Sequence, residues 1–181
     1  RKLPQYLKNK EFAKLNDLGQ AIAARIGLTT AADTFNPVIV DFYEQVGFLA
    51  DAIVNYLLLL GWSLDDHTEE FTREEMIENF SLKRVNKAPA SFDPAKLLAF
   101  QDRYMQRLSV KQKVAMVLPY LQQAGFVATP PPCETSYKLK AIVEAAGERI
   151  KVAGDILDYT DFYTADDELT YDEKAFEKRL T

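Results

Sequence analysis

The spacing of apolar residues restricts this chain to a helical fold. Between residues 12 and 26 the apolar side chains recur in steps of three and four, so they share one face of a helix that Gly27 ends. The same spacing predicts two further helices that end at Gly47 and Gly61, and the second is apolar on most sides, so we expect it to be buried. Residues 29–37 are predicted to form a loop. Because no run of residues alternates as a β-strand would, we predict an all-α fold.

Capping residues mark where the later helices begin. A Ser or Thr followed three residues later by Glu or Gln satisfies the free N–H groups of a helix start, and an Asp before a Pro has the same effect. Such starts occur at Thr72, Asp93, Ser109 and Thr170. The prolines at 130–132 predict an extended linker, after which helical spacing resumes from Tyr137 to Ile150.

Length and composition exclude several classes of protein. The 181 residues suffice for one domain or two small ones, and 48% hydrophobic with 12% aromatic content is typical of a globular protein. The single cysteine, Cys133, excludes a disulfide framework and a cysteine-clustered zinc site, and it favours an intracellular setting. The longest apolar run, residues 52–62, is far shorter than the roughly 20 residues that cross a bilayer, so we expect no membrane span. The chain starts at Arg1 without an initiator methionine or a signal segment, and we expect it to be an internal piece of a longer protein.

No constellation of residues predicts an active site. His67 lies in a polar turn without a serine or cysteine motif, and we interpret it and the proline-flanked Cys133 as ordinary loop residues. The sequence has no glycine-rich phosphate loop, no dinucleotide-binding fingerprint and no His-Glu-x-x-His pair. The acidic run 166–168 lacks the spacing and the glycine of a calcium loop. We therefore predict no catalytic residue and no metal site.

The charges are sorted along the chain. A net charge of -5 and a pI near 5.0 would argue against a polyanionic partner. The net charge is -6 over residues 65–79 but +6 over residues 83–113. Residues 155–181 carry -6, so the rest of the chain, residues 1–154, carries +1 of the total of -5. We expect the basic segment to face an anionic partner and much of the acidic end to face away from it.

The basic segment suits an RNA backbone. Lys96, Arg103 and Arg107 are separated by seven and four residues and therefore line one side of a helix. Cations neutralise phosphates and aromatic rings stack on exposed bases. The aromatic residues interleaved with the cations are Phe92, Phe100 and Tyr104. The alternative interpretation is that these cations belong to ordinary solvated helix faces.

Several strings resemble the bacterial-type glutamyl-tRNA synthetases, which are class I aminoacyl-tRNA synthetases. Asn55-Tyr56-Leu57 followed by Leu60-Gly61-Trp62-Ser63 is similar to the segment after the catalytic Lys-Met-Ser-Lys-Ser-type loop of that family. Three further landmarks follow in the family's order, namely Glu75-Met76-Ile77 before Phe80-Ser81-Leu82, Phe92-Asp93 before Lys96-Leu97 and Tyr104, and Tyr171-Asp172-Glu173 before Lys178 and Leu180. The resemblance covers residues 37–181.

The resemblance implies the tRNA-binding portion of an enzyme that joins glutamate to tRNA using ATP with Mg. It implies a connector or insertion with one helix at 1–36, a helical stem-contact domain at 37–108, and the start of a helical anticodon-binding domain at 109–181. It also implies a cytoplasmic monomer that binds tRNA, with the catalytic domain elsewhere in the parent chain, so no cofactor is expected in this segment. Helical spacing after Ser109 disfavours the glutaminyl branch, which carries β-barrels for the anticodon.

The RNA contacts follow from the basic segment and the resemblance together. The predicted phosphate contacts are Lys83, Arg84, Lys87, Lys96, Arg103 and Arg107, with Tyr104 as a weaker candidate. We expect Tyr56, Trp62 and Phe92 to pack in the core, and Asn55 to cap or orient a turn rather than touch RNA.

The chain departs from the family pattern at two places, and two other functions stay open. Ala99 and Gln101 stand where the family commonly has a Trp and an Asn, and residues 3–36 look like an insertion in a usually short connector.

One alternative function is a helical protein-interaction module that binds a basic partner through the acidic end from Asp155 onward. The other is a stand-alone helical RNA-binding regulator without aminoacylation activity.

Overall fold

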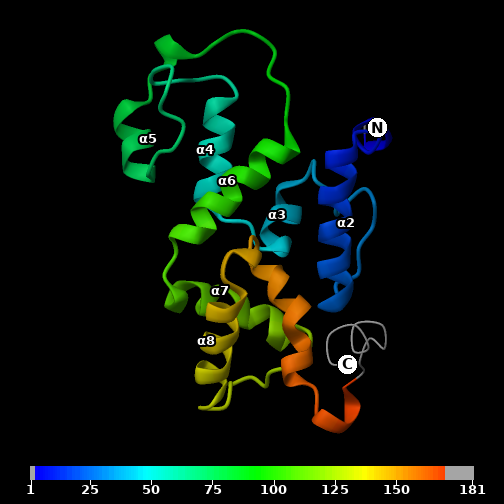
Figure 1. The fold of residues 1–181 in the computed structure, drawn as a ribbon. Helices are drawn as coiled ribbons and strands as arrows, with labels where there is room; N and C mark the ends of the chain where they lie inside the picture. The colour runs from blue at the N-terminus through cyan, green and yellow to red at the C-terminus, as the bar shows by residue number, and fades with distance from the viewer. Residues whose placement is uncertain (1–2, 170–181) are drawn as a thin grey trace, which may run out of the picture.

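Every regular element in the structure is helical within the range it describes. The structure is a computed structural model that describes residues 3–169 (Figure 1). The α-helices are α1 (Leu3–Tyr6), α2 (Lys10–Arg25), α3 (Val40–Val46), α4 (Ala50–Leu59), α5 (Arg73–Asn79), α6 (Pro94–Arg107), α7 (Val110–Gln123) and α8 (Thr135–Ala146). Helices of the 3-10 type are η1 (Leu82–Arg84), η2 (Gly147–Arg149), η3 (Ala153–Tyr163) and η4 (Asp166–Glu168). The all-α prediction is confirmed.

The later helices begin at the capping residues that the sequence indicates. Thr72 and Glu75 cap each other's backbone at the start of α5, over 3.2 and 2.7 Å. Ser109 and Gln112 form the same reciprocal pair before α7. The Asp93 carboxylate accepts from two N–H groups in the first turn of α6. The capping motif predicted at Thr170 lies outside the described residues.

Helix α4 is less buried than its sequence predicts. We expected burial on most sides, but Val54 and Leu57 are 48% and 50% exposed. The buried positions are Ala52, Asn55 and Tyr56, which lie on one face. Helix α4 packs chiefly against α6, and packing against one neighbour buries only one stripe of a helix. The exposed Leu57 lines an apolar groove with residues of α1, α2 and α3.

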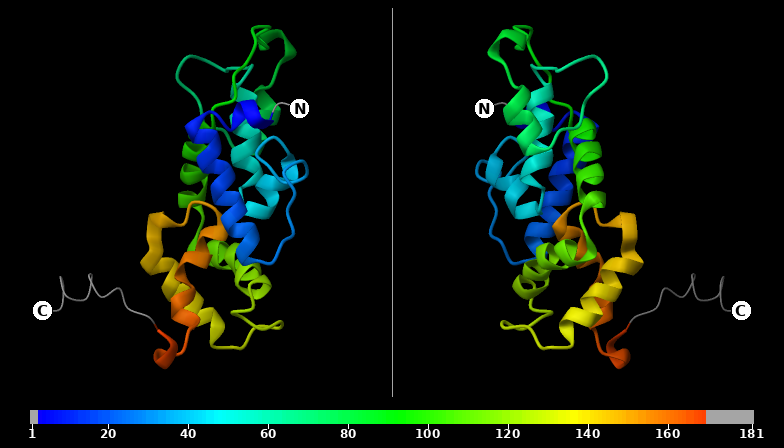
Figure 2. Two further views of the ribbon diagram at one scale, coloured as in Figure 1. Left: turned by 90° about the vertical axis from the view of Figure 1, so that its right-hand side faces the viewer. Right: turned by 90° about the vertical axis from the view of Figure 1, so that its left-hand side faces the viewer.

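The helices form two stacked groups around one continuous core. Helices α2, α3, α4 and α6 make one group, and α7, α8 and η3 make the other below it (Figures 1 and 2). A single cluster of buried side chains runs through both groups, with members such as Leu15, Tyr56, Phe100, Val117, Leu139 and Ile156. Because the segments 1–36, 37–108 and 109–169 share this core, the predicted domain boundaries stay predictions.

A smaller second cluster lies beneath α5 and the loop before it. It consists of Trp62, Phe71 and Met76. The Trp62 ring packs edge-on against Phe71, with 5.8 Å between ring centroids. The predicted core positions of Tyr56 and Trp62 are confirmed, while Phe92 is half-buried against the Tyr56 ring.

The helix of the N-terminal segment joins both groups. Helix α2 contacts α3 and α6 in one group and η3 in the other (Figure 2). At its end, the Arg25 guanidinium pairs with Asp158 over 2.7 Å and also donates to the Leu157 carbonyl. Gly154 in η3 lies directly against Ile22, so a side chain there would collide with α2. The segment that looks like an insertion is therefore an integral part of the fold.

Two contacts around residues 47–49 hold the groups together. Gln101 is fully buried, its Oε1 accepts from Leu49 N over 2.8 Å, and its Nε2 donates to Lys151 O over 2.7 Å. Beside it, Ala153 N donates to Gly47 O over 3.1 Å. The amide at position 101 thus has a structural role in bonding the start of α4 to the segment before η3.

No described helix combines the length and the apolarity that a bilayer crossing requires.

Candidate nucleic-acid interface

A fixed acidic loop covers the basic face of α6. The buried Asn55 side chain donates to Glu69 O over 2.8 Å and accepts from Phe71 N over 2.7 Å. The Tyr104 hydroxyl lies 2.6 Å from both Asn55 Oδ1 and Phe71 O. These bonds hold the backbone of Glu69, Glu70 and Phe71 against α6. The expectation that Asn55 orients a turn is confirmed.

The carboxylates of this loop bind the cations of α6. Lys96 Nζ lies 2.8 Å from Glu69 Oε1, and Arg103 Nε lies 2.5 Å from Glu70 Oε1. Arg107 pairs with the other oxygen of Glu70. The three cations do share one side of α6, as their spacing indicates. The acidic and basic segments of the sequence thus fold onto each other at this face.

The ion pairs are partly open to solvent. The hydrogen bond from Lys96 lowers the pKa of the Glu69 carboxyl below its usual value. The Arg103 guanidinium lies 4.5 Å from the centroid of the Phe100 ring, and Arg107 lies 5.4 Å from that of Tyr104. Aromatic rings therefore support the guanidinium groups from beneath. Phe100 is fully buried, so it cannot stack on a base as the sequence had indicated.

The cations at residues 83–87 have a different environment. Lys83, Arg84 and Lys87 are all exposed on η1 and the loop after it. Within residues 3–169, neither Lys83 nor Lys87 has an ion-pair partner within 4.0 Å. The Arg84 guanidinium donates to the Leu64 carbonyl over 2.7 Å. Because a carbonyl carries no net charge, this bond does not neutralise the guanidinium. This segment offers cations that no carboxylate of the described residues occupies.

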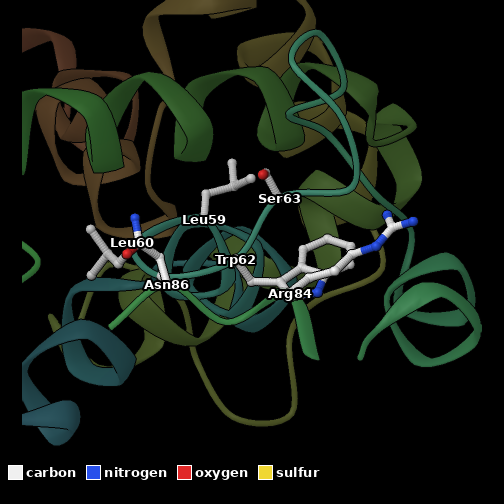
Figure 3. Close-up of a pocket in the computed structure, with 7 residues that line it drawn as sticks. Leu59, Leu60, Trp62, Ser63, Arg84 and Asn86 are labelled. Carbon is white, nitrogen blue, oxygen red and sulfur yellow. The ribbon is translucent and has the colours of Figure 1, made fainter. Parts of the chain in front are cut away.

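A small pocket opens beside these cations. It has a volume of about 140 Å³ and lies between the turn after α4 and the loop after η1, which are joined by a 2.7 Å hydrogen bond from Asn86 N to Gly61 O. Figure 3 shows Leu60 and Asn86 on one side of it and Trp62 with Arg84 on the other. The polar side chains that line it belong to Trp62, Ser63, Arg84 and Asn86, and none of them is acidic. The Trp62 Nε1–H is buried with no acceptor among the described residues. A pocket of this kind suits an anionic or acceptor-rich group.

The structure thus divides the seven predicted contact residues into two sets. Lys83, Arg84 and Lys87 lie together on the exposed loop, whereas Lys96, Arg103, Arg107 and Tyr104 lie on α6 against the acidic loop. Sequence reasoning missed Glu69 and Glu70 as partners of the α6 cations. The equal and opposite net charges of residues 65–79 and 83–113 were a signal for such pairing.

We expect Tyr104→Phe to lower the free energy of unfolding by about 1 kcal/mol, because it removes a half-buried hydroxyl that bonds the acidic loop. We expect RNA affinity to change by less than about twofold, because that hydroxyl is already engaged within the protein. Urea unfolding followed by circular dichroism and fluorescence anisotropy with labelled RNA measure the two quantities. A loss of affinity with unchanged stability would instead identify Tyr104 as an RNA contact.

The remaining candidate residues form no site. His67 is exposed in the acidic loop, where its backbone N–H donates to Asp65 over 2.8 Å. That bond and a 2.6 Å bond from Thr68 N lower the pKa of the Asp65 carboxyl. Cys133 is exposed on the loop before α8. In the described part of the chain, no group of three or more His, Cys, Asp or Glu side chains is placed to hold a metal ion.

Two family profiles match successive parts of the sequence. Residues 33–99 match the catalytic domain of the class I tRNA synthetases for glutamate and glutamine. Residues 112–181 match an anticodon-binding domain. Helices α3, α4 and α5 and the start of α6 therefore fall within the family's catalytic-domain profile, and α8 with most of α7 falls within the anticodon-binding one.

Curated and solved relatives agree with these profiles. The glutamate–tRNA ligase of Desulforudis audaxviator is 40% identical over 143 residues, which are 78% of this chain and 28% of that protein. That of Roseiflexus castenholzii is 41% identical over 126 residues, which are 69% of this chain and 24% of that protein. The crystal structure of a glutamate tRNA ligase from Elizabethkingia meningosepticum, in complex with its amino acid, matches 77% of this chain and 26% of its own, with a TM-score of 0.63 and 29% identity.

The chain spans about a quarter of the length of the relatives it matches. The two profiles follow each other in the order in which the sequence landmarks occur. Between Ser109 and residue 169 every regular element is helical, which agrees with the glutamyl rather than the glutaminyl pattern. The chain belongs to the family of bacterial glutamyl-tRNA synthetases.

Proposed function

We propose that this chain is the tRNA-binding portion of a glutamyl-tRNA synthetase, whose intact form ligates glutamate to tRNA at the expense of ATP. The observation that carries the proposal is the loop at residues 83–87, whose exposed cations have no carboxylate partner among the described residues and whose Arg84 lines a pocket without acidic residues. Phosphates are the ligands that such cations select. The match to an anticodon-binding domain supports the same partner.

The two helical groups suit two separate regions of one tRNA. In our proposal, residues 37–108 form a stem-contact domain that grips the inner side of the tRNA, and residues 109–181 approach the anticodon. Residues 1–36 form a connector, in which the structure has the short α1 besides the one expected helix, and its longer helix α2 fixes the two against each other. The acidic residues of η3 face away from the RNA. The protein acts as a cytoplasmic monomer.

Activation of glutamate takes place outside this chain in our proposal. The described residues are helices and loops and offer neither a glycine-rich phosphate loop nor a sheet on which a nucleotide could lie. They therefore do not fit ATP with Mg, and we assign no step of aminoacylation to them. The contribution of this chain is to position the tRNA.

We expect Lys83→Gln with Lys87→Gln to weaken binding of a glutamate tRNA transcript about tenfold, because two phosphate contacts are lost. The slope of log Kd against log salt should fall by about 1.5 for the same reason. Fluorescence anisotropy of labelled transcript at several salt concentrations measures both. Both side chains are exposed, so the variant should fold as the parent does.

The matched control is Lys8→Gln with Lys10→Gln, which removes the same charge from exposed positions at the N-terminal end that have no carboxylate partner within 4.0 Å in residues 3–169. We expect its affinity and salt slope to stay close to those of the parent. Equal losses of affinity in the two variants would mean that tRNA binding depends only on the net charge of the protein, which would contradict a site at residues 83–87. If the parent chain does not bind tRNA at all, the proposed function is wrong and a protein-interaction module is the better interpretation.

A further inference from the structure

Glu70 occupies the position that a phosphate would take on α6. Its two carboxylate oxygens bind Arg103 and Arg107, one guanidinium each. Phosphate and carboxylate are both bound by guanidinium groups through paired oxygens, so the same cations could hold either. Glu69 holds Lys96 in the same manner. Each of the three cations predicted on α6 is therefore already bound to an anion of the same chain.

The carboxylates are held on a rigid support. Asn55 fixes the backbone on both sides of Glu70, and its side chain is fully buried. Glu70 is also the less exposed partner of its pairs, at 24% against 44% for Arg103 and 58% for Arg107. A loosely tethered surface acid would leave the cations available to any RNA. An acid placed this firmly competes with RNA phosphates for the two arginines.

The two cationic regions consequently respond differently to RNA. At residues 83–87 a phosphate meets cations that no carboxylate within residues 3–169 neutralises, whereas on α6 it competes with a carboxylate. Exposed ion pairs are individually weak, so displacement is possible at a modest cost for a ligand that gains contacts elsewhere. A ligand that touches only α6 gains nothing to offset that cost.

We propose that Glu69 and Glu70 determine RNA specificity by competing with phosphates for Lys96, Arg103 and Arg107. This inference rests on the proposed function, because it concerns how the tRNA-binding face rejects other RNA. An RNA whose shape contacts the 83–87 loop and α6 together displaces the acids. An RNA that makes scattered phosphate contacts does not.

The test is Glu70→Gln, which keeps the size of the side chain and removes its charge. Affinities are measured for a glutamate tRNA transcript and for polyuridylate of the same length, over a range of salt concentrations. We expect the affinity for polyuridylate to rise about tenfold, with a salt slope steeper by about one to two, because two arginines become free for phosphates. We expect the affinity for the transcript to rise only about threefold, so that the ratio of the two affinities falls.

The matched control is Glu78→Gln on α5, an exposed acid with no cationic partner within 4.0 Å in residues 3–169. It should change neither affinity by more than about twofold. Unchanged affinities in Glu70→Gln, or a fall in affinity for the transcript, would overturn the inference while leaving tRNA binding by the parent chain intact. Failure of the proposed function looks different, because the parent chain would then bind the transcript no better than polyuridylate.

Discussion

Gly47→Ala is expected to lower the free energy of unfolding by about 3 kcal/mol, which for a chain of this size lowers Tm by roughly 6–12 °C. Gly47 ends α3 with φ +94°, a left-handed conformation that costs an alanine about 1–2 kcal/mol. An added Cβ would also lie 2.6 Å from Ala153 Cβ and 2.8 Å from Ala153 N. Relieving that collision must shift the backbone where the two helical groups meet, at about 1–3 kcal/mol more. Thermal unfolding followed by circular dichroism measures the change.

Gly125→Ala separates the two causes. Gly125 has φ +81°, but no atom lies within 4 Å of where its Cβ would be. Only the conformational cost should appear, about 1–2 kcal/mol. If both variants lose the same stability, the contact between Gly47 and Ala153 does not restrict the fold in the manner described.

Asn55→Ala is expected to lower the free energy of unfolding by about 3 kcal/mol. The substitution removes the hydrogen bonds of the Asn55 side chain with Glu69 O and the Tyr104 hydroxyl, and it leaves the N–H of the buried Phe71 without its acceptor. The loop that carries Glu69 and Glu70 should open before the rest of the protein. Trp62 is the single tryptophan and packs on Phe71, so its fluorescence should change at a lower urea concentration than the far-ultraviolet circular dichroism.

Asn79→Ala is the matched control for Asn55→Ala. The Asn79 side chain donates to Glu75 O over 2.8 Å at the end of α5, where solvent can replace the lost bond. We expect a loss below about 1 kcal/mol and coincident transitions for the two probes. Coincident transitions in Asn55→Ala as well would show that Asn55 stabilises the whole fold rather than this loop.

The local sequence predicted most helix starts and ends, because caps and breakers act within a few residues. Thr72, Asp93 and Ser109 cap helices as expected, and Gly27 and Gly47 end them with positive φ. Burial was harder to predict, since it depends on the neighbours that the fold supplies. Val54 and Leu57 of α4 are exposed for that reason, although their apolar side chains predict burial.

The candidate interface was predicted in composition but not in arrangement. Spacing alone placed Lys96, Arg103 and Arg107 on one side of a helix, and the structure agrees. That Glu70 faces them follows from Asn55, which lies 15 residues earlier and fixes the acidic loop on α6. Such a contact between distant parts of the chain leaves no local pattern. The six cations remain predicted phosphate contacts, and Tyr104→Phe tests Tyr104, the weaker candidate.

The packing of α2 against η3 has a consequence for how the protein is made. Residues 10–25 leave the ribosome before their partner at 153–163, which follows only after roughly 130 further residues. At about 5–20 residues per second, α2 therefore waits on the order of 6–26 s for that partner. During this time the apolar face of α2, including Ile22, lacks part of its final cover. We expect nascent chains stopped before residue 153 to bind chaperones that hold exposed apolar segments, and release to coincide with synthesis of η3.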